Sequence, residues 1–288
     1  MLLLSTAPRI ISKALVARPT SKEKKGVTTS CAMTEQHRFV LGMRVDAISY
    51  IEVTKLVMEW ARAAQSCYVC VANVHMTMET YDSLEFRHIV NGANLVVPDG
   101  MPLVWALHLL GVTGQQRVYG PDLTRRLCEA AAQEEIPVAL YGGTPESLGG
   151  LSQFLTKEYP TLRIVCRIAP PFRSLTPEED ALFTLQIANS GARIVFVGVG
   201  CPKQERWMAS HVGRLPAVMV GVGAAFDFQS GRVRQAPVWM QLMGLEWFHR
   251  LLMEPRRLWK RYLRHNPRFL FFLTLQLLGL GRHGEEAQ

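Results

Sequence analysis

The chain has 288 residues, of which 48% are hydrophobic and 19% charged, and its formal net charge is +8 at pH 7. This composition excludes a disordered protein, and the length suits one large α/β domain with appendages or two small domains. The longest apolar candidate, residues 269–280, is shorter than the roughly 20 residues of a membrane-spanning helix. The six cysteines show no disulfide framework, which favours a reducing compartment. Cys67 and Cys70 point to opposite faces of an expected strand, so they cannot share a metal ion.

The first 37 residues differ in composition from the rest of the chain. They contain no acid before Glu23, and their opening apolar patch is too short for a secretory signal peptide. We expect residues 1–37 to be a disordered leader of the transit-peptide type, or sequence upstream of a true start at Met33. We therefore place them outside the folded domain.

From residue 38 onward, short β-branched runs alternate with helical patterns. Strands are expected over residues 38–45 (a strand or a hairpin), 68–74, 95–100, 137–143, 163–169, 193–200 and 217–228. Helices are expected over residues 46–64, 77–93, 101–111, 120–135, 176–191 and 202–215, with a further helix start at Thr144. This alternation predicts a Rossmann-like α/β fold, in which a mostly parallel sheet carries helices on both faces. The strands are continuously apolar, as burial on both faces requires.

Past Gly231 the pattern changes to basic and aromatic helical sequence without further strands. We therefore expect a Rossmann-like catalytic domain over residues 38–232 and a helical appendage over residues 233–288. Arginines and lysines of the appendage are interleaved with Trp247, Phe248, Trp259, Tyr262 and Phe269. This mixture is typical of a segment that lies on an anionic membrane. Nucleic acid is the alternative partner, but the core shows no nucleic-acid-binding module, so the membrane is favoured.

Polar residues and glycines follow five of the expected strands. They are Asn73, Asp99, Gly142 with Gly143, Gly198 and Gly200 with Lys203 and Gln204, and Gly221 with Asp227. Any one of these polar residues could be an ordinary helix cap. Ligands of open α/β sheets bind beyond the carboxyl ends of the strands, so five such ends on one rim indicate a ligand site.

Two of these strand ends are glycine-rich loops suited to phosphate. The stretch GVGCPKQE, residues 198–205, is neither a GxGxxG fingerprint nor a GxxxxGK[ST] loop. It also lacks a following acid placed for a ribose, which argues against an NAD-dependent oxidoreductase. Gly142 and Gly143 permit close backbone approach, and the helix start behind them supplies N–H groups. Together the loops predict a nucleotide diphosphate as ligand and no separate cofactor.

Asp99 is the predicted catalytic base, because a carboxylate at a strand end can take a proton from an attacking hydroxyl when its pKa is raised. Its other possible role is to cap the helix at residues 101–111, and the two roles are compatible. The sequence contains no Asp-x-Asp pair, so no metal site is predicted. Helix N-termini, Arg117, Lys203 and arginines of the appendage would then stabilise a leaving diphosphate.

Taken together, these residues resemble the WecG/TagA/CpsF family of bacterial glycosyltransferases, glycosyltransferase family 26. The resemblance covers residues 39–269, and its motifs occur in the family's order. They are VANVHM, NGANLVVPDGMPLVW, RVYGPDL, YGG, FVGVGCPKQERWM, GVGAAFDFQSGRVRQAP and GLEWFHRLLMEPRRLWKRYL.

The resemblance implies an inverting, metal-independent transfer of a sugar from a UDP-sugar to a polyprenyl-diphosphate-linked sugar at the cytoplasmic face of the membrane. The default sugar is N-acetylmannosamine. Asp99 would be the base, and Asn73, Arg117 and Gln204 would contact the donor or act in catalysis. Asp227 would contact the nucleotide. The two arginines expected to grip the acceptor or the leaving diphosphate are Arg250 and Arg257.

The chain departs from the family pattern at three positions. Val71 stands where many members have Thr, Lys260 where an Arg is common, and Cys201 where a smaller residue is common. Lysine keeps the charge but loses the bidentate geometry of arginine. A non-catalytic nucleotide-binding or nucleic-acid-binding protein with a basic tail is the alternative function, and a homo-oligomer is left open.

Overall fold

The protein is described here from a computed structural model, which covers residues 36–223, 225–231 and 233–280. The chain divides between Ala32 and Met33, and all described residues belong to the second unit, residues 33–288. The predicted leader lies outside the described residues except for its last two positions. His37 already belongs to the first strand, so the folded unit begins slightly before the expected boundary.

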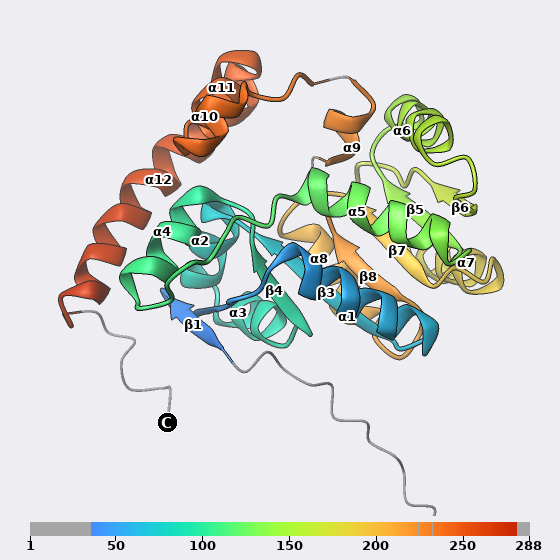
Figure 1. The fold of residues 1–288 in the computed structure, drawn as a ribbon, viewed down its shortest axis with the longest axis horizontal. Coiled ribbons are helices and arrows are strands. Elements are labelled where there is room, and N and C mark those ends of the chain that lie inside the picture. Colours follow the sequence, from blue (N-terminus) through green and yellow to red (C-terminus); the bar gives the residue numbers. More distant parts are fainter. Residues whose placement is uncertain (1–35, 224, 232, 281–288) are drawn as a thin grey trace, which may run out of the picture. The chain divides into compact units, whose positions relative to one another are not determined.

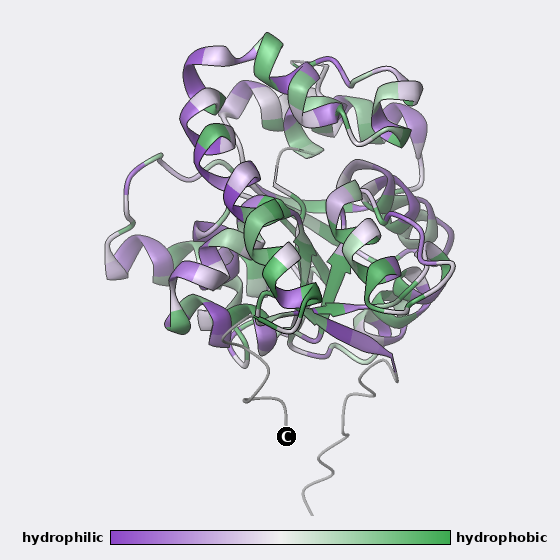
Figure 2. Cartoon of the chain, turned by 90° about the vertical axis from the view of Figure 1, so that its left-hand side faces the viewer, coloured by the Kyte–Doolittle hydropathy of each residue, from purple (hydrophilic) through white to green (hydrophobic). Residues whose placement is uncertain are grey.

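A six-stranded parallel sheet forms the centre of this unit, as predicted (Figure 1). In spatial order its strands are β4 (Leu95–Pro98), β3 (Cys67–Ala72), β8 (Val218–Gly221), β7 (Ile194–Gly198), β5 (Val138–Gly142) and β6 (Ile164–Ile168). All residues of β3, β4, β5 and β8 are buried. Such burial on both faces explains why these strands are continuously apolar. Figure 2 shows them as the hydrophobic centre of the unit.

A two-stranded hairpin precedes the sheet. Strands β1 (His37–Val40) and β2 (Met43–Asp46) are antiparallel, and Leu41 and Gly42 turn the chain with φ angles of 52° and 83°. The side chain of Asp46 accepts a hydrogen bond of 2.7 Å from the backbone N–H of Val96 in β4. This bond attaches the hairpin beside β4, the edge strand of the main sheet. Of the two expectations for residues 38–45, a strand or a hairpin, the structure shows the hairpin.

Nine helices of the described chain precede the appendage, and they lie on both faces of the sheet (Figure 1). They are α1 (Tyr50–Arg62), α2 (Val74–Asp82), α3 (Leu84–Asn91), α4 (Met101–Leu109), α5 (Gly120–Gln133), α6 (Pro145–Glu158), α7 (Pro177–Asn189), α8 (Lys203–Ser210) and α9 (Ala225–Gln229). The expected helix over 77–93 is in fact two helices, because Ser83 ends α2 and its hydroxyl caps α3. The expected strand over 217–228 was too long: β8 ends at Gly221, and α9 follows.

The appendage is helical, as predicted, with α10 (Val238–Leu242), α11 (Glu246–Met253) and α12 (Pro255–Leu277). Figure 2 shows mixed hydropathy along these helices. α12 packs on α2, where the Tyr81 and Phe272 rings stack at 4.5 Å and Arg268 pairs with Asp82 at 2.6 Å. Although α12 has 23 residues, no helix in the described ranges is both long and apolar enough to cross a membrane.

Candidate active site

A cavity of about 990 Å³ lies at the predicted rim. Its walls are formed by residues that follow the carboxyl ends of β3, β4, β5, β7 and β8, together with residues of α11 and α12. Of the residues predicted from the sequence, it is lined by Asn73, Asp99, Arg117, Gly143, Gly198, Gly200, Gln204, Gly221, Asp227, Arg250 and Arg257. Gly142 and Lys203 are not among the lining residues.

Asp99 directly follows β4, and both its backbone and its side chain form hydrogen bonds with backbone groups of other segments. Its N–H donates to the carbonyl of Ala72 at 2.8 Å, and its Oδ1 accepts from the N–H of Gly120 at 3.1 Å. Its side chain therefore bonds to the start of α5, whereas α4, the helix that it would cap in the alternative role, has Gly100 as its N-cap residue. Its side chain is 18% exposed. Burial raises the pKa of Asp99 to about 6, against the opposing effect of Arg117.

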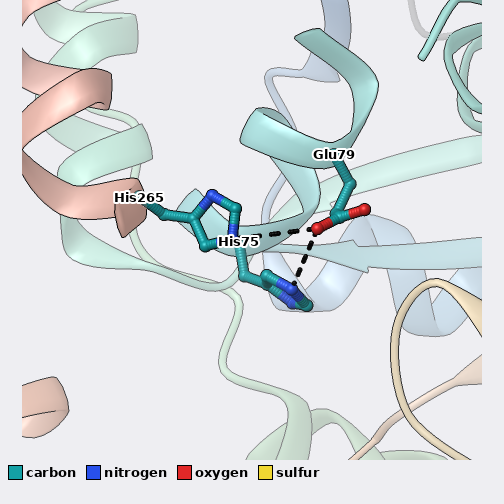
Figure 3. Close-up of side chains that lie close together, drawn as sticks. All are labelled: His75, Glu79 and His265. Carbon is teal, nitrogen blue, oxygen red and sulfur yellow. Dashed lines mark ion pairs between the residues drawn. The ribbon is translucent and has the colours of Figure 1, made fainter. Parts of the chain in front are cut away.

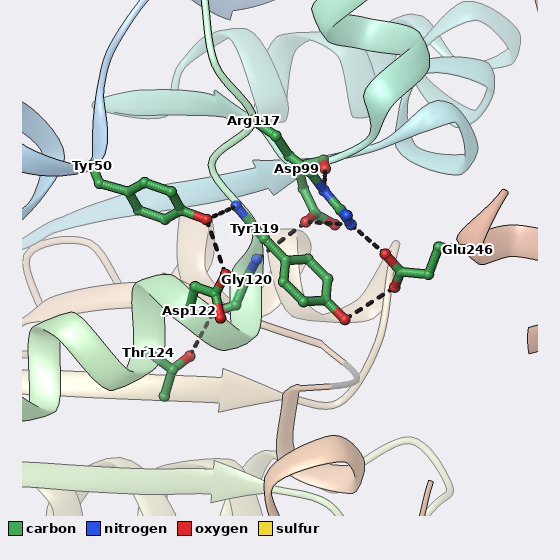
Figure 4. Close-up of polar contacts among 8 residues, drawn as sticks. All are labelled: Tyr50, Asp99, Arg117, Tyr119, Gly120, Asp122, Thr124 and Glu246. Carbon is green, nitrogen blue, oxygen red and sulfur yellow. Dashed lines mark hydrogen bonds and ion pairs between the residues drawn. The ribbon is translucent and has the colours of Figure 1, made fainter. Parts of the chain in front are cut away.

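Arg117 links Asp99 to the appendage (Figure 4). Its Nε donates to the Asp99 carbonyl, and its Nη2 lies 3.5 Å from Asp99 Oδ1 and 2.6 Å from Glu246 Oε2. The guanidinium stacks on the Tyr119 ring at 3.9 Å, and the Tyr119 hydroxyl donates to Glu246 Oε1 at 3.0 Å. Glu246 begins α11, so the appendage contributes a carboxylate next to the predicted base. Its negative charge adds to the rise in the Asp99 pKa.

The glycines of β5 and β7 allow these two strand ends to approach closely. Gly142 has a φ of 135°, and a Cβ there would lie 2.5 Å from the carbonyl carbon of Gly198. The N–H of Gly143 donates to the Gly198 carbonyl at 3.2 Å, and Thr144 then caps α6. Gly142 therefore serves strand packing, while Gly143 and Thr144 face the cavity.

In the PKQE stretch, residues 202–205, Gln204 lines the cavity and Glu205 lies in the core. Gln204 is 3% exposed, and its Nε2 donates to Glu205 Oε1 at 2.7 Å, while its own Oε1 has no hydrogen-bond partner among the described residues. Glu205 lies in the first turn of α8 but is completely buried, and burial raises its pKa to about 7. Lys203 is exposed and is not among the residues that line the cavity.

Asn73 and Asp227 lie at helix starts on the cavity wall. Asn73 is the N-cap of α2, where its Oδ1 accepts from the N–H of Met76 at 3.2 Å. Asp227 lies in the first turn of α9. The two predicted roles of Asn73, helix cap and ligand contact, are compatible, because capping uses only its side-chain oxygen.

Arginines of the appendage make the opposite wall basic. Arg250 lies 3.7 Å and Arg257 2.7 Å from the Glu254 carboxylate. The Nε atoms of Arg250 and Arg261 are buried and lack a hydrogen-bond partner among the described residues. Partly buried guanidinium groups with an unused donor are suited to bind an anion.

The profile of the glycosyl transferase WecG/TagA/CpsF family matches residues 38–283. The chain is also similar to N-acetylglucosaminyldiphosphoundecaprenol N-acetyl-beta-D-mannosaminyltransferase of Bacillus subtilis (strain 168), with 30% identity over 196 residues, 68% of this chain and 74% of that protein. The chain belongs to the WecG/TagA/CpsF family. It is a glycosyltransferase, which confirms the resemblance found in the sequence and disfavours the alternative of a non-catalytic binding protein.

Three residues in or beside the site of this glycosyltransferase were not predicted from its sequence: Glu246, Tyr119 and Glu205. All three lie inside motifs that were quoted for the family, yet none was assigned a role. Glu246 offered a signal, since it is an acid immediately before a strongly basic segment. Such an acid needs a cationic partner when it is buried, and Arg117 provides it.

A cluster that the sequence analysis did not single out lies where the appendage meets α2 (Figure 3). His75 Nε2 lies 3.4 Å and His265 Nε2 3.8 Å from the same oxygen, Glu79 Oε1. The two imidazole centroids are 5.1 Å apart. Burial lowers the pKa of His75 to about 3 and also lowers that of His265. Both histidines line the cavity of the glycosyltransferase.

Proposed function

We propose that this glycosyltransferase moves N-acetylmannosamine from its UDP-sugar to the hydroxyl of a polyprenyl-diphosphate-linked N-acetylglucosamine. The Bacillus subtilis relative has this acceptor and this sugar in its name. The observation that carries the proposal is Asp99, a carboxylate of raised pKa in a large cavity with basic walls.

Asp99 is the general base of the proposed reaction. Its carboxylate takes the proton of the acceptor hydroxyl as the hydroxyl oxygen bonds to the anomeric carbon. The bond from that carbon to the UDP oxygen breaks on the opposite side, so the configuration inverts. A base works best when its pKa lies near the working pH, and a pKa of about 6 leaves Asp99 mostly ionised at pH 7 while making it a stronger base than an ordinary carboxylate.

The leaving UDP is stabilised by protein donors in this proposal. The N-termini of α6 and α8 follow the ends of β5 and β7, and helix N-termini favour negative charge. Arg250 and Arg257 supply full positive charge from the other wall. Because the sequence lacks an Asp-x-Asp pair, we propose that no metal ion binds the diphosphate.

The appendage brings the site to the cytoplasmic face of an anionic membrane in this proposal. Large apolar side chains are exposed on it beside many arginines, and such mixtures favour the membrane interface. These exposed side chains include Trp239, Leu242, Met243, Trp247, Phe248, Leu252, Met253, Trp259 and Leu263. A lipid-linked acceptor would then reach the cavity from the membrane surface.

A UDP-release screen tests the proposal. The protein is incubated with a panel of UDP-sugars and a short-chain prenyl-diphosphate-N-acetylglucosamine, and the lipid product is identified by mass spectrometry. We expect acceptor-dependent UDP release and a product larger by one N-acetylhexosamine, also in EDTA. Absence of a glycosylated product with every donor would overturn the proposal. Activity lost in EDTA and restored only by Mg²⁺ or Mn²⁺ would overturn metal-free departure of UDP.

A further inference from the structure

Three side chains from two helices point at one position between α2 and α12 (Figure 3). His75 and Glu79 lie one turn apart on α2, and His265 comes from the middle of α12. Their ligand atoms, two imidazole nitrogens and one carboxylate oxygen, all lie within 4.8 Å of one another. Within the described ranges, it is the one group of at least three histidine, cysteine or acidic side chains that lie close enough together to hold a metal ion.

The separations fit a small metal ion placed between the three atoms. Tetrahedral zinc with bonds of about 2.0–2.1 Å to nitrogen and oxygen places its ligand atoms about 3.4 Å apart. The two nitrogen–oxygen distances of 3.4 and 3.8 Å are close to this value. Both nitrogens converge on a single oxygen, Oε1 of Glu79, rather than one on each oxygen. All three ligand atoms lie within 4.8 Å of one another, so one ion placed between them could reach all three.

We propose that His75, Glu79 and His265 bind one divalent transition-metal ion of the Zn²⁺ class. Imidazole nitrogens select such metals, whereas Mg²⁺ and Ca²⁺ prefer oxygen ligands. Two histidines and one glutamate are a known donor set for zinc, and they leave the fourth position to water.

The charges around the cluster allow such an ion. Arg264 and Arg268 lie near His265, but the Asp82 carboxylate pairs with them at 3.7 and 2.6 Å. The positive charge of Arg261 also lies near His75. Glu79 supplies a negative charge directly to the ion. We therefore expect binding that is weakened, but not prevented, by the neighbouring arginine.

The proposed ion would tie the appendage to the catalytic domain. Its ligands come from both sides of the contact between α2 and α12, which the stacked Tyr81 and Phe272 rings also hold. Since α2 begins directly after Asn73, a tie at His75 fixes α12 close to the rim of the cavity. This role is independent of the proposed transfer reaction.

Metal titration of the untagged full chain tests the site. The protein is stripped with a chelator, desalted and titrated with Zn²⁺ by calorimetry and with Co²⁺ by visible absorption. We expect one tight ion per chain and the intense absorption of a four- or five-coordinate Co²⁺ site. His75→Asn, Glu79→Gln and His265→Asn should each weaken binding by about 100-fold or more, since even supporting residues contribute 10–100-fold. His88→Asn, an exposed histidine on α3, is the matched control and should bind as the wild type.

Two results would overturn the proposal. One is a wild-type Co²⁺ spectrum like that of the free hydrated ion, which decides the question even if the variants fail to fold. The other is equal affinity of the wild type and the folded ligand variants. Because both readouts measure bound metal and not sugar transfer, failure of the metal site and failure of the proposed enzymatic activity are distinguishable.

Discussion

Replacing Asp99 by Asn separates the reactivity of this side chain from its effect on stability. Asn has nearly the same shape, and its Oδ1 can still accept the hydrogen bond from Gly120. It cannot take a proton from the acceptor hydroxyl. We therefore expect the turnover number to fall by about 10²–10⁴-fold, the usual contribution of a general base. UDP binding should remain close to that of the wild type.

The same substitution should stabilise the fold at neutral pH. Burial raises the pKa of Asp99 from 3.8 to about 6, so the folded state binds this proton more tightly than the unfolded state. This contribution favours folding fully below pH 3.8 and is lost as the pH rises through about 6. The shift corresponds to about 3 kcal/mol at pH 7. Because this shift already includes the opposing attraction to Arg117, we expect Asn to give a net gain of up to about 3 kcal/mol at pH 7 that vanishes near pH 4.

The assays are sugar transfer, UDP calorimetry and urea unfolding at pH 4.5 and 7.5. Asp122→Asn, an exposed carboxylate on α5, is the matched control and should change none of them appreciably. Wild-type transfer should also decline as the pH falls through about 6, since the base must be ionised. Wild-type turnover in Asp99→Asn would remove Asp99 from the mechanism. If Asp99→Asn lowered the free energy of unfolding equally at both pH values, burial would not be the cause of a raised Asp99 pKa.

Three further substitutions test other parts of the structure. Glu246→Gln removes a charge that raises the pKa of the predicted base, so the acidic limb of the transfer–pH profile should move to lower pH; an unchanged limb would contradict this coupling. Urea titration tests the packing of Gly142. Gly142→Ala should lower the free energy of unfolding by about 1–3 kcal/mol, because its φ is unfavourable for alanine and a Cβ would collide with the Gly198 backbone. Gly149→Ala, which lies in open space on α6, is the control and should be neutral or slightly stabilising. Leu263→Ser should reduce sedimentation with anionic vesicles, and Leu84→Ser, similarly exposed on α3, should not; equal binding of the two would argue against docking through the appendage.

Much of the fold and of the rim could be predicted from local sequence. Strands buried on both faces must be apolar throughout, and this marks them in the sequence without knowledge of their neighbours. Parallel strands place their carboxyl ends at one edge, so Asn73, Asp99 and Gln204 could be assigned to one site before their contacts were known. The ends of helices and strands were predicted less accurately. Strand β8 was predicted too long because Ala225 and Phe226 are apolar, and apolar residues occur in buried strands and in buried helices such as α9.

The amino-acid sequence by itself determined the strands, the glycine loops and the identity of the candidate base, because each depends on residues close together in the chain. Only the tertiary structure decided which distant groups surround them. Glu246 reaches Arg117 across 129 positions, and His265 meets His75 because α12 returns to α2. Neither pairing could be predicted from a sequence period or from a motif spacing. The environment that raises the pKa of Asp99 therefore arises from packing, since the burial of Asp99 and the nearby charge of Glu246 exist only in the folded chain.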